Sequence, residues 1–334
     1  MVTLRDVAAD AGVSISTASR VLTGARPVKA DNARAVLESA SRLGYRGHHI
    51  ARSLRTQATQ SVGVIVPVIS NPFFPVLVQA IERALHHEHD LAVLLCDSQD
   101  SAALEAQRIG ALLERQVDAL LCVPCHVHES SDAIRAAAAT VPVVQIDRWT
   151  DDSVVDIVSI DHAAGIRTVV EHLIGTGRHR LAYVGADTTN AAARTRATAF
   201  RKRLDDAGIT PGPVLAGAYT IEWGREAAEQ LLRTSGTPDA VVCGNDLIAI
   251  GVLDQLRAAG VAVPDDIALT GFDGIDFTLS TAPPLTTVAQ PVERIAARTV
   301  ELLLERIGGS AEPHHVDRFD GDLIVRESTA PDHG

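Results

Sequence analysis

Cysteine and histidine residues in the first half of the chain have a spacing that could bind a metal or a haem. Cys122-Val123-Pro124-Cys125-His126 matches a covalent haem site, and adding His128 gives two thiols and two imidazoles for zinc. Covalent haem attachment requires export, and the chain begins without a basic segment followed by an apolar stretch. We prefer the alternative, a buried strand cysteine followed by a loop, and expect no metal and no cofactor.

A second histidine-rich segment, His86-His87-Glu88-His89, lies at the end of an expected helix. Only His86 and His89, three positions apart, could share a metal, and a solvated helix end is the simpler interpretation. The sequence has no phosphate-binding G-x-x-x-x-G-K-S/T loop, no G-x-G-x-x-G after its first strand and no nucleophile elbow. We therefore do not expect an enzyme.

Hydroxyl groups and a guanidinium follow one another from Ser14 to Arg20, where they could contact DNA. Apolar residues at helical spacing predict a short helix that ends at Gly12. Ser14 should cap a second helix over 15–22 by accepting the amide of Thr17. In that helix Ala18, Val21 and Leu22 face inward, and the outer face carries Ser16, Thr17, Ser19 and Arg20.

A third helix is expected over 30–43 and should end at Gly44. We expect it to bury Ala33, Val36, Leu37 and Ala40. A helix, a glycine turn and a polar second helix are typical of a helix-turn-helix that enters the major groove, although a plain three-helix bundle has the same periodicity. Ile15 favours the first interpretation, because a thymine methyl group would cover this outward-facing apolar residue.

The charge distribution agrees with a DNA-binding head on an acidic body. Residues 1–60 contain nine Lys or Arg and four Asp or Glu, whereas the rest of the chain contains 21 and 38. Each phosphate contact needs a cation, so the basic head is suited to DNA even though the net charge of the chain is −12.

Length and composition indicate a globular protein of two or three domains. The chain has 334 residues, of which 46% are hydrophobic and 22% charged. No apolar run approaches the roughly 20 residues that cross a bilayer. Four scattered cysteines do not form a disulfide framework. We expect a cytoplasmic protein.

Strands and helices alternate from Ser61 onward. Val62-Gly63-Val64-Ile65-Val66 predicts a strand buried on both faces, and strand and helix patterns follow in turn to a last helix over 292–307. Such alternation predicts parallel sheets covered on both faces. The elements are too many for one sheet, so we expect two doubly wound α/β halves with a break near 160–163 and a ligand cleft at the carboxyl ends of their strands.

The motifs of the head resemble the LacI/GalR family of bacterial transcription factors. They are Thr3-Leu4-Arg5-Asp6-Val7-Ala8, Ala11-Gly12-Val13-Ser14, Thr17-Ala18-Ser19-Arg20-Val21-Leu22, Leu43-Gly44-Tyr45 and Ala51-Arg52-Ser53-Leu54-Arg55-Thr56. The resemblance covers nearly the whole chain and implies a periplasmic-binding-protein-like effector domain. It also implies that bases are read by Ile15, Ser16 and Arg20. The full set of expected DNA contacts is Ser14, Ile15, Ser16, Thr17, Ser19, Arg20, Ala51 and Leu54.

The resemblance further implies a hinge helix over about 50–55, with Leu54 wedged between base steps of the minor groove. The family usually opens this hinge with Pro-Asn, whereas this chain has Gly47-His48-His49. Glycine adds unfolded-state entropy and histidine titrates near neutral pH. The hinge is therefore expected to fold less readily, or to make DNA binding depend on pH; equal operator affinity at pH 6 and pH 8 would exclude the second idea.

For the effector cleft, the resemblance implies residues at strand ends and on facing helices. They are Asn71, Phe73, Phe74, Asp147, Arg148, Asp161, Arg196, Tyr219, Asn245 with its neighbour Asp246, and Asp273. Carboxylates, an amide, a guanidinium and aromatic faces together suit a sugar or a nucleoside. Taken singly, Asp147, Asn245 and Asp273 could equally be cap or turn residues, because Asn and Asp are common after strands.

We therefore expect a ligand-controlled regulator, most simply a repressor. Residues 1–46 form the DNA-binding domain, 47–60 the hinge and 61–330 the effector and dimerisation domain, whose halves are about 61–160 with 290–318 and 161–289 with 319–330. Since no heptad tail follows Arg326, we expect a dimer on a palindromic operator. The alternatives are a sugar-binding protein without a DNA function and an enzyme on the same scaffold.

Overall fold

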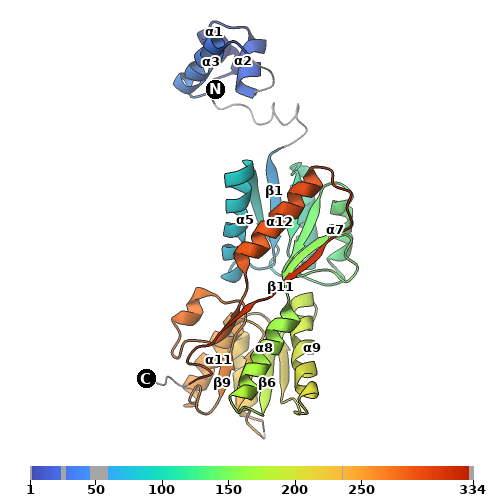
Figure 1. Cartoon of the computed structure of the whole chain (residues 1–334), viewed down its shortest axis with the longest axis vertical. Helices are drawn as coiled ribbons and strands as arrows, with labels where there is room; N and C mark the ends of the chain where they lie inside the picture. Colours follow the sequence, from blue (N-terminus) through green and yellow to red (C-terminus); the bar gives the residue numbers. More distant parts are fainter. Residues whose placement is uncertain (1, 24–27, 46–58, 235, 331–334) are drawn as a thin grey trace. The chain divides into compact units, whose positions relative to one another are not determined.

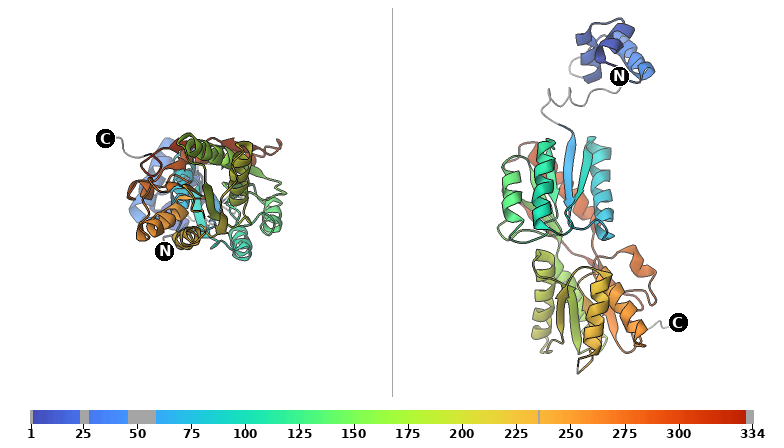
Figure 2. Two further views of the ribbon diagram at one scale, coloured as in Figure 1. Left: turned by 90° about the horizontal axis from the view of Figure 1, so that it is seen from below. Right: turned by 180° about the vertical axis from the view of Figure 1, so that it is seen from behind.

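The computed structural model describes residues 2–23, 28–45, 59–234 and 236–330. They form two compact units, residues 1–60 and 61–334. Figures 1 and 2 show an all-helical first unit and a second unit of two sheets with helices on both faces. No helix in the described ranges is long and apolar enough to cross a membrane.

The first unit contains α1 (Leu4–Asp10), α2 (Ile15–Thr23) and α3 (Ala30–Leu43). Thr3 and Asp6 cap α1 reciprocally, and Gly12 and Gly44 adopt the left-handed conformation that ends α1 and α3. The small core is made of Val7, Ala8, Ala18, Val36 and Ala40. The predicted turns and caps of this unit are confirmed.

Two core predictions for α3 differ from the structure, because Ala33 is only partly buried and Leu37 is exposed. Leu37 was expected to be buried, but 56% of it is exposed. Ser39 occupies the inward position instead, fully buried, and its hydroxyl donates to the Val7 carbonyl and to the Asp10 carboxylate. A hydroxyl with two acceptors can be buried at little cost, so α3 is rotated relative to its apolar pattern.

The first half of the second unit is a parallel six-stranded sheet in the order β11-β5-β4-β3-β1-β2. Its strands are β1 (Ser61–Val66), β2 (Ala92–Asp97), β3 (Ala119–Cys122), β4 (Val143–Ile146), β5 (Asp156–Ile160) and β11 (Val316–Phe319). One face packs on α5 (Phe73–His89) and α12 (Val292–Ile307), the other on α6 (Ala102–Glu114) and α7 (Ser131–Ala138). As predicted, β1 is buried along its whole length.

The second half is a parallel four-stranded sheet in the order β7-β6-β8-β9. Its strands are β6 (Leu181–Ala186), β7 (Val214–Gly217), β8 (Ala240–Cys243) and β9 (Ala268–Thr270). One face packs on α8 (His162–Gly175) and α9 (Ala191–Asp206), the other on α10 (Ile221–Leu232) and α11 (Asp246–Ala258). A short 3-10 helix, η1 (Asp276–Leu279), follows β9.

The chain passes between the halves near residues 161, 290 and 320. There β10 (Thr287–Ala289) pairs antiparallel with β12 (Asp322–Ile324), and α12 returns to the first half, as expected. The fold class is confirmed, and the helices and strands expected from periodicity are present. The sequence did not reveal β5, β7, β10, β11 and β12. Of these, β7, β11 and β12 are partly exposed and β10 has three residues, whereas β5 is fully buried but Asp156 and Ser159 interrupt its apolar run.

Candidate functional site

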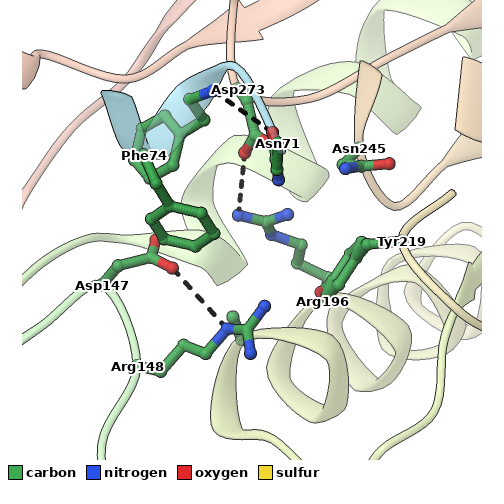
Figure 3. A pocket seen from close by; sticks show the side chains of 10 residues that line it. Asn71, Phe74, Asp147, Arg148, Arg196, Tyr219, Asn245 and Asp273 are labelled. Carbon is green, nitrogen blue, oxygen red and sulfur yellow. Dashed lines mark hydrogen bonds and ion pairs between the residues drawn. The ribbon is translucent and has the colours of Figure 1, made fainter. Parts of the chain in front are cut away.

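A pocket lies between the two halves of the second unit, at the carboxyl ends of their strands (Figure 3). The first half contributes Asn71, Phe73, Phe74, Asp147 and Arg148, and the second half contributes Ala192, Arg196, Tyr219, Asn245 and Asp273. Parallel strands end at the same edge of a sheet, so the loops of two facing sheets converge there. Nine of the eleven residues predicted for this cleft line the pocket.

Besides Asp246, which is described below, Asp161 is an exception. Its carboxylate accepts the backbone amide of Ala164 at 2.8 Å and so caps α8. This is the role that Asp has most often at such a position, directly before a helix. The structure does not place Asp161 in the pocket lining, and we withdraw it from the expected set.

Arg196 extends from α9 and is held on every side within this pocket. Its Nε donates to His162 Nδ1 at 3.2 Å, Nη1 to the Gly244 carbonyl at 2.6 Å, and Nη2 to Asp273 Oδ1 at 3.4 Å. The guanidinium also lies 3.8 Å from the centroid of the Phe272 ring. A buried charge is tolerated only when it is paired and hydrogen-bonded, and these contacts meet that condition.

His162, which sequence reasoning missed, connects Arg196 to the other half. It is fully buried at the start of α8, stacks on Trp149, and its Nε2 lies 2.9 Å from the Asp147 carbonyl. Burial and the nearby Arg196 lower the pKa of His162 to about 4. A neutral ring that accepts at Nδ1 must donate at Nε2, so His162 bridges the guanidinium and the Asp147 backbone. The sequence feature that could have identified His162 is its position next to Asp161, where the chain passes from the first half to the second.

Arg148 follows β4 and is held less completely than Arg196. Its Nη1 lies 3.2 Å from Asp100 Oδ1, and the guanidinium faces the rings of Phe74 and Tyr219 at 5.9 and 5.3 Å. Its Nε is buried and has no hydrogen-bond partner within the described residues. Burial acts to lower the pKa of Arg148, but Asp100, Tyr219 and Asp147 raise it, so the charge persists.

The acidic residues of the second half form a supported pair. Asp273 accepts a hydrogen bond from Gln290 Nε2 at 2.9 Å, and burial raises the pKa of its carboxyl to about 6 although Arg196 opposes this. Asp246, beneath it, accepts the amides of Gly274 and Ile275 at 2.7 and 2.8 Å and the Thr287 hydroxyl. Asp246 therefore fixes the turn that presents Asp273, and does not itself line the pocket.

Several buried polar atoms around the pocket have no hydrogen-bond partner within the described residues, although Arg148 Nε lies 3.9 Å from Asp147 Oδ2 in an ion pair (Figure 3). In the described part of the chain these include Arg148 Nε, Tyr219 OH, Asn245 Nδ2 and Gln290 Oε1. Leaving such groups unpaired costs about 1–3 kcal/mol each, so their convergence indicates a polar ligand. The pocket itself has about 10 Å³ of open space, and it adjoins a cavity of about 340 Å³ that shares Asn71, Phe74, Arg148 and Tyr219.

The cysteine and histidine cluster does not resemble a metal site. Cys122 is buried on β3, and the Cys125 thiol lies 3.0 Å from the Ser98 hydroxyl. Burial raises the pKa of both thiols, whereas a metal requires thiolates. His126 Nδ1 accepts the amides of His128 and Glu129. Within the described ranges no group of three His, Cys, Asp or Glu side chains could hold a metal; the side chains of His87 and Glu88 lie outside them.

In the first unit, α2 presents the expected polar face. Ser14 accepts the Thr17 amide at 3.1 Å, as predicted, and Ile15 is 45% exposed. Ser16 and Arg20 are exposed, and Thr17 and Ser19 are partly so. Ala51, Leu54 and the Gly47-His48-His49 segment lie outside the described residues.

Comparisons with known proteins cover nearly the whole chain. Residues 3–47 match the model of the bacterial regulatory proteins of the lacI family, and residues 170–329 match a periplasmic binding protein-like domain. The chain is 31% identical to the HTH-type transcriptional repressor PurR of Pasteurella multocida and 32% identical to that of Haemophilus influenzae (strain PittEE). Each alignment covers 98% of both chains.

Solved structures agree with the sequence relatives. The Lac repressor dimer bound to operator and the anti-inducer ONPF superposes with a TM-score of 0.90 at 26% identity, covering 98% of this chain and 99% of the other. A LacI family regulator from Enterococcus faecium with bound ribose has a TM-score of 0.72 at 28% identity, covering 81% and 99%. The chain therefore belongs to the LacI family of bacterial regulatory proteins and is a DNA-binding transcriptional regulator.

Proposed function

We propose that this regulator is a repressor whose DNA binding is controlled by a sugar or nucleoside bound between the two halves of its α/β unit. The observation that carries the proposal is the convergence of unpartnered buried polar atoms on one pocket. Relatives support it, since the Lac repressor is seen with an operator and the Enterococcus faecium regulator with ribose. We place the protein in the cytoplasm, where bacterial DNA lies.

The chemistry of the pocket favours a ligand rich in hydroxyl groups. Asp147 and Asp273 accept hydroxyl protons, Asn245 and Arg148 have donors to offer, and the adjoining cavity has the size of a small-molecule site. The rings of Phe74 and Tyr219, on opposite halves, can cover the C–H faces of a sugar ring or a base. Asn71 and Phe73 complete this wall.

We infer that the head reads an operator half-site with α2. Arg20 is long enough to donate to a guanine edge, the Ser16 hydroxyl can contact either base type, and Ile15 can contact a thymine methyl group. Ser14, Thr17 and Ser19 flank them on the same segment. Residues 1–46 would form this domain, 47–60 the hinge with Ala51 and Leu54, and 61–330 the effector domain.

We infer a homodimer through the side of the second unit that carries α5, β2 and η1. Val76, Leu95, Phe277 and Leu279 on these elements are 43–61% exposed, and apolar side chains grouped on one side of a protein are typical of an interface. Figures 1 and 2 show α5 and η1 on the same side. Two-fold symmetry would pair two heads on a palindromic operator. Light scattering of the purified chain tests this, and a monomer or tetramer would contradict it.

Control follows from the position of the pocket. A ligand that prefers one arrangement of the two halves shifts the population of that arrangement and, through β1 and the preceding hinge, the affinity for DNA. By linkage, DNA must change the affinity for the ligand by the same factor.

Affinity selection of sheared genomic DNA on the purified chain, followed by sequencing, tests the regulator. We expect one or a few palindromic sites, and the neighbouring genes then nominate the ligand. The selection is repeated with pooled sugars and pooled nucleosides, which should change the recovery of those sites. Tight sugar binding with no enriched site under any condition would instead support a sugar-binding protein without a DNA function.

A further inference from the structure

A second hollow lies on the outer surface of the second half, between α8 and α9. Its volume is about 440 Å³, larger than the cavity beside the central pocket. Its lining consists of Ala163, Arg167, Arg194, Thr195, Thr198, Ala199, Lys202, Arg203 and Asp206. Four of these nine residues are cations and one is an acid, in a chain whose net charge is −12.

The cations come from both helices, and three of them, Arg167, Lys202 and Arg203, have either a single ion-pair partner or none within the described residues. Lys202 Nζ lies 3.2 Å from Asp206, and Arg203 Nε lies 3.0 Å from Glu171. Arg167 is exposed and has no ion-pair partner within the described residues. Exposed ion pairs contribute about 0–1 kcal/mol, so a ligand with several negative oxygens can displace them at little cost.

We propose that the α8–α9 hollow binds a phosphorylated small molecule, such as a sugar phosphate or a nucleotide. Arg167, Lys202 and Arg203 would contact the phosphate with charge-assisted hydrogen bonds. The hydroxyls of Thr195 and Thr198 can form hydrogen bonds with the rest of the ligand, and the small side chains of Ala163 and Ala199 leave space for it. A volume of about 440 Å³ is that of a small-molecule site and not of an extended protein contact.

This site is distinct from the central pocket. Arg196, on the same helix, points inward to Asp273, whereas Arg194 and Lys202 line the outer hollow. The α8–α9 layer and the α10–α11 layer cover opposite faces of the four-stranded sheet.

One cation of the hollow also ties the two halves together. Arg194 forms a bidentate ion pair with Asp151, a residue of the first half that follows β4. The hydrogen bond with Arg194 lowers the pKa of Asp151, so this carboxylate stays charged. Next to it, the Val127 amide of the first half donates to the Thr189 carbonyl of the second at 2.9 Å. A phosphate that engages Arg194 competes with Asp151, and the site therefore acts on the contact between the halves.

Isothermal titration calorimetry of the full chain with glucose 6-phosphate, adenosine monophosphate and inorganic phosphate tests the proposal, with glucose as the uncharged control. We expect at least one ester to bind, and the double variant Arg167→Ala/Lys202→Ala to weaken it about tenfold or more. Arg201→Ala is the matched control, because Arg201 is an exposed arginine of α9 outside the hollow, and should bind as the parent does.

Two further results decide the assignment. Asp151→Ala removes the competitor of Arg194 and should raise ester affinity about two- to fivefold; an unchanged affinity would disprove the link between the halves. No binding of either ester at about 10 mM, or equal binding by the double variant, would overturn the site itself. Binding of an acidic peptide but of neither ester would overturn the assignment to a small molecule.

Discussion

The head and the central pocket differ in how their residues are assembled. The segment proposed to read DNA, Ser14–Arg20, is continuous in sequence and covers the cap and first turns of α2. Apart from Ala18, which belongs to the core, it is largely exposed. The pocket takes its residues from positions 71 to 273, from loops and helices of both halves, and buries two arginines and two aspartates.

This difference reflects what each site must recognise. The phosphates that border the major groove carry a high density of negative charge. A protein can therefore bind there with an exposed polar surface whose shape fits the groove. A small neutral ligand has to be enclosed, so the protein must bury charges and pair them in the absence of ligand. Arg196 donates three hydrogen bonds, whereas Arg148 and Asn245 each keep a buried donor without a hydrogen bond, so we expect Arg196 to support the site and the other two to donate to the ligand.

The largest expected effect is at Arg196. Arg196→Ala leaves Asp273 and His162 without their buried partner, and removing one member of such a pair costs about 3–5 kcal/mol. We expect effector binding, measured by calorimetry, to fall more than about 100-fold while operator binding by the head is kept. Thermal melting establishes that the variant is folded. An intact ligand response would show that the pocket is assigned to the wrong residues.

The opposite pattern, loss of operator binding with effector binding kept, is expected for a substitution at Arg20. Arg20→Ala should weaken binding to the selected operator by about 10- to 100-fold, because a bidentate contact to a base is lost, and should leave effector binding unchanged. Fluorescence anisotropy with operator and scrambled duplexes measures this. Equal losses on both duplexes would mean that Arg20 contacts phosphates and does not read bases.

Effector binding should depend on pH through Asp273. Its carboxyl has a pKa raised by burial to about 6, so acid protonates it and removes an acceptor. We expect effector affinity to be constant above pH 7 and about tenfold weaker at pH 5 than at pH 8. Asp273→Asn should flatten the profile. The pKa of Asp273 is higher in the folded chain than in the unfolded chain, so protonation of Asp273 stabilises the folded chain as the pH falls from 6 to 4. Acid unfolding caused by Asp273 therefore does not explain the weaker effector binding at pH 5.

The smallest expected effect concerns the corrected core residue of the head. Leu37→Ala should change the free energy of unfolding by less than about 0.5 kcal/mol, because the side chain is 56% exposed. Val36→Ala, the matched control one residue earlier, empties a buried site and should cost about 1–2 kcal/mol. Urea unfolding of the full chain compares the free energies of unfolding of the two variants. A larger loss for Leu37→Ala than for Val36→Ala would show that Leu37 belongs to the core.

Periodicity predicted most of the fold but not all of its elements. The run Val62–Val66 and the glycines at 12 and 44 carry their information locally, in branched side chains and in a left-handed backbone. By contrast, β10, β11 and β12 have three or four residues and exist only because partners distant in sequence lie beside them. Leu37 was misassigned because an apolar residue near the edge of a helix stripe can face either way, and the Ser39 contacts with Val7 and Asp10 decided the rotation.

The sequence by itself determined the family, the alternation of strands and helices, the polar face of α2 and nine of the residues that line the pocket. The alternation and the polar face of α2 depend on residue types and short spacings within one element, whereas the pocket residues, which lie far apart in sequence, followed from the family resemblance. The Asp161 cap is a local contact with Ala164, whereas the tertiary structure alone decided that His162 joins Arg196 to the opposite half and that Asp246 supports the Asp273 turn. These two roles depend on atoms more than ten residues apart meeting within hydrogen-bond distance, and only the tertiary packing fixes such meetings.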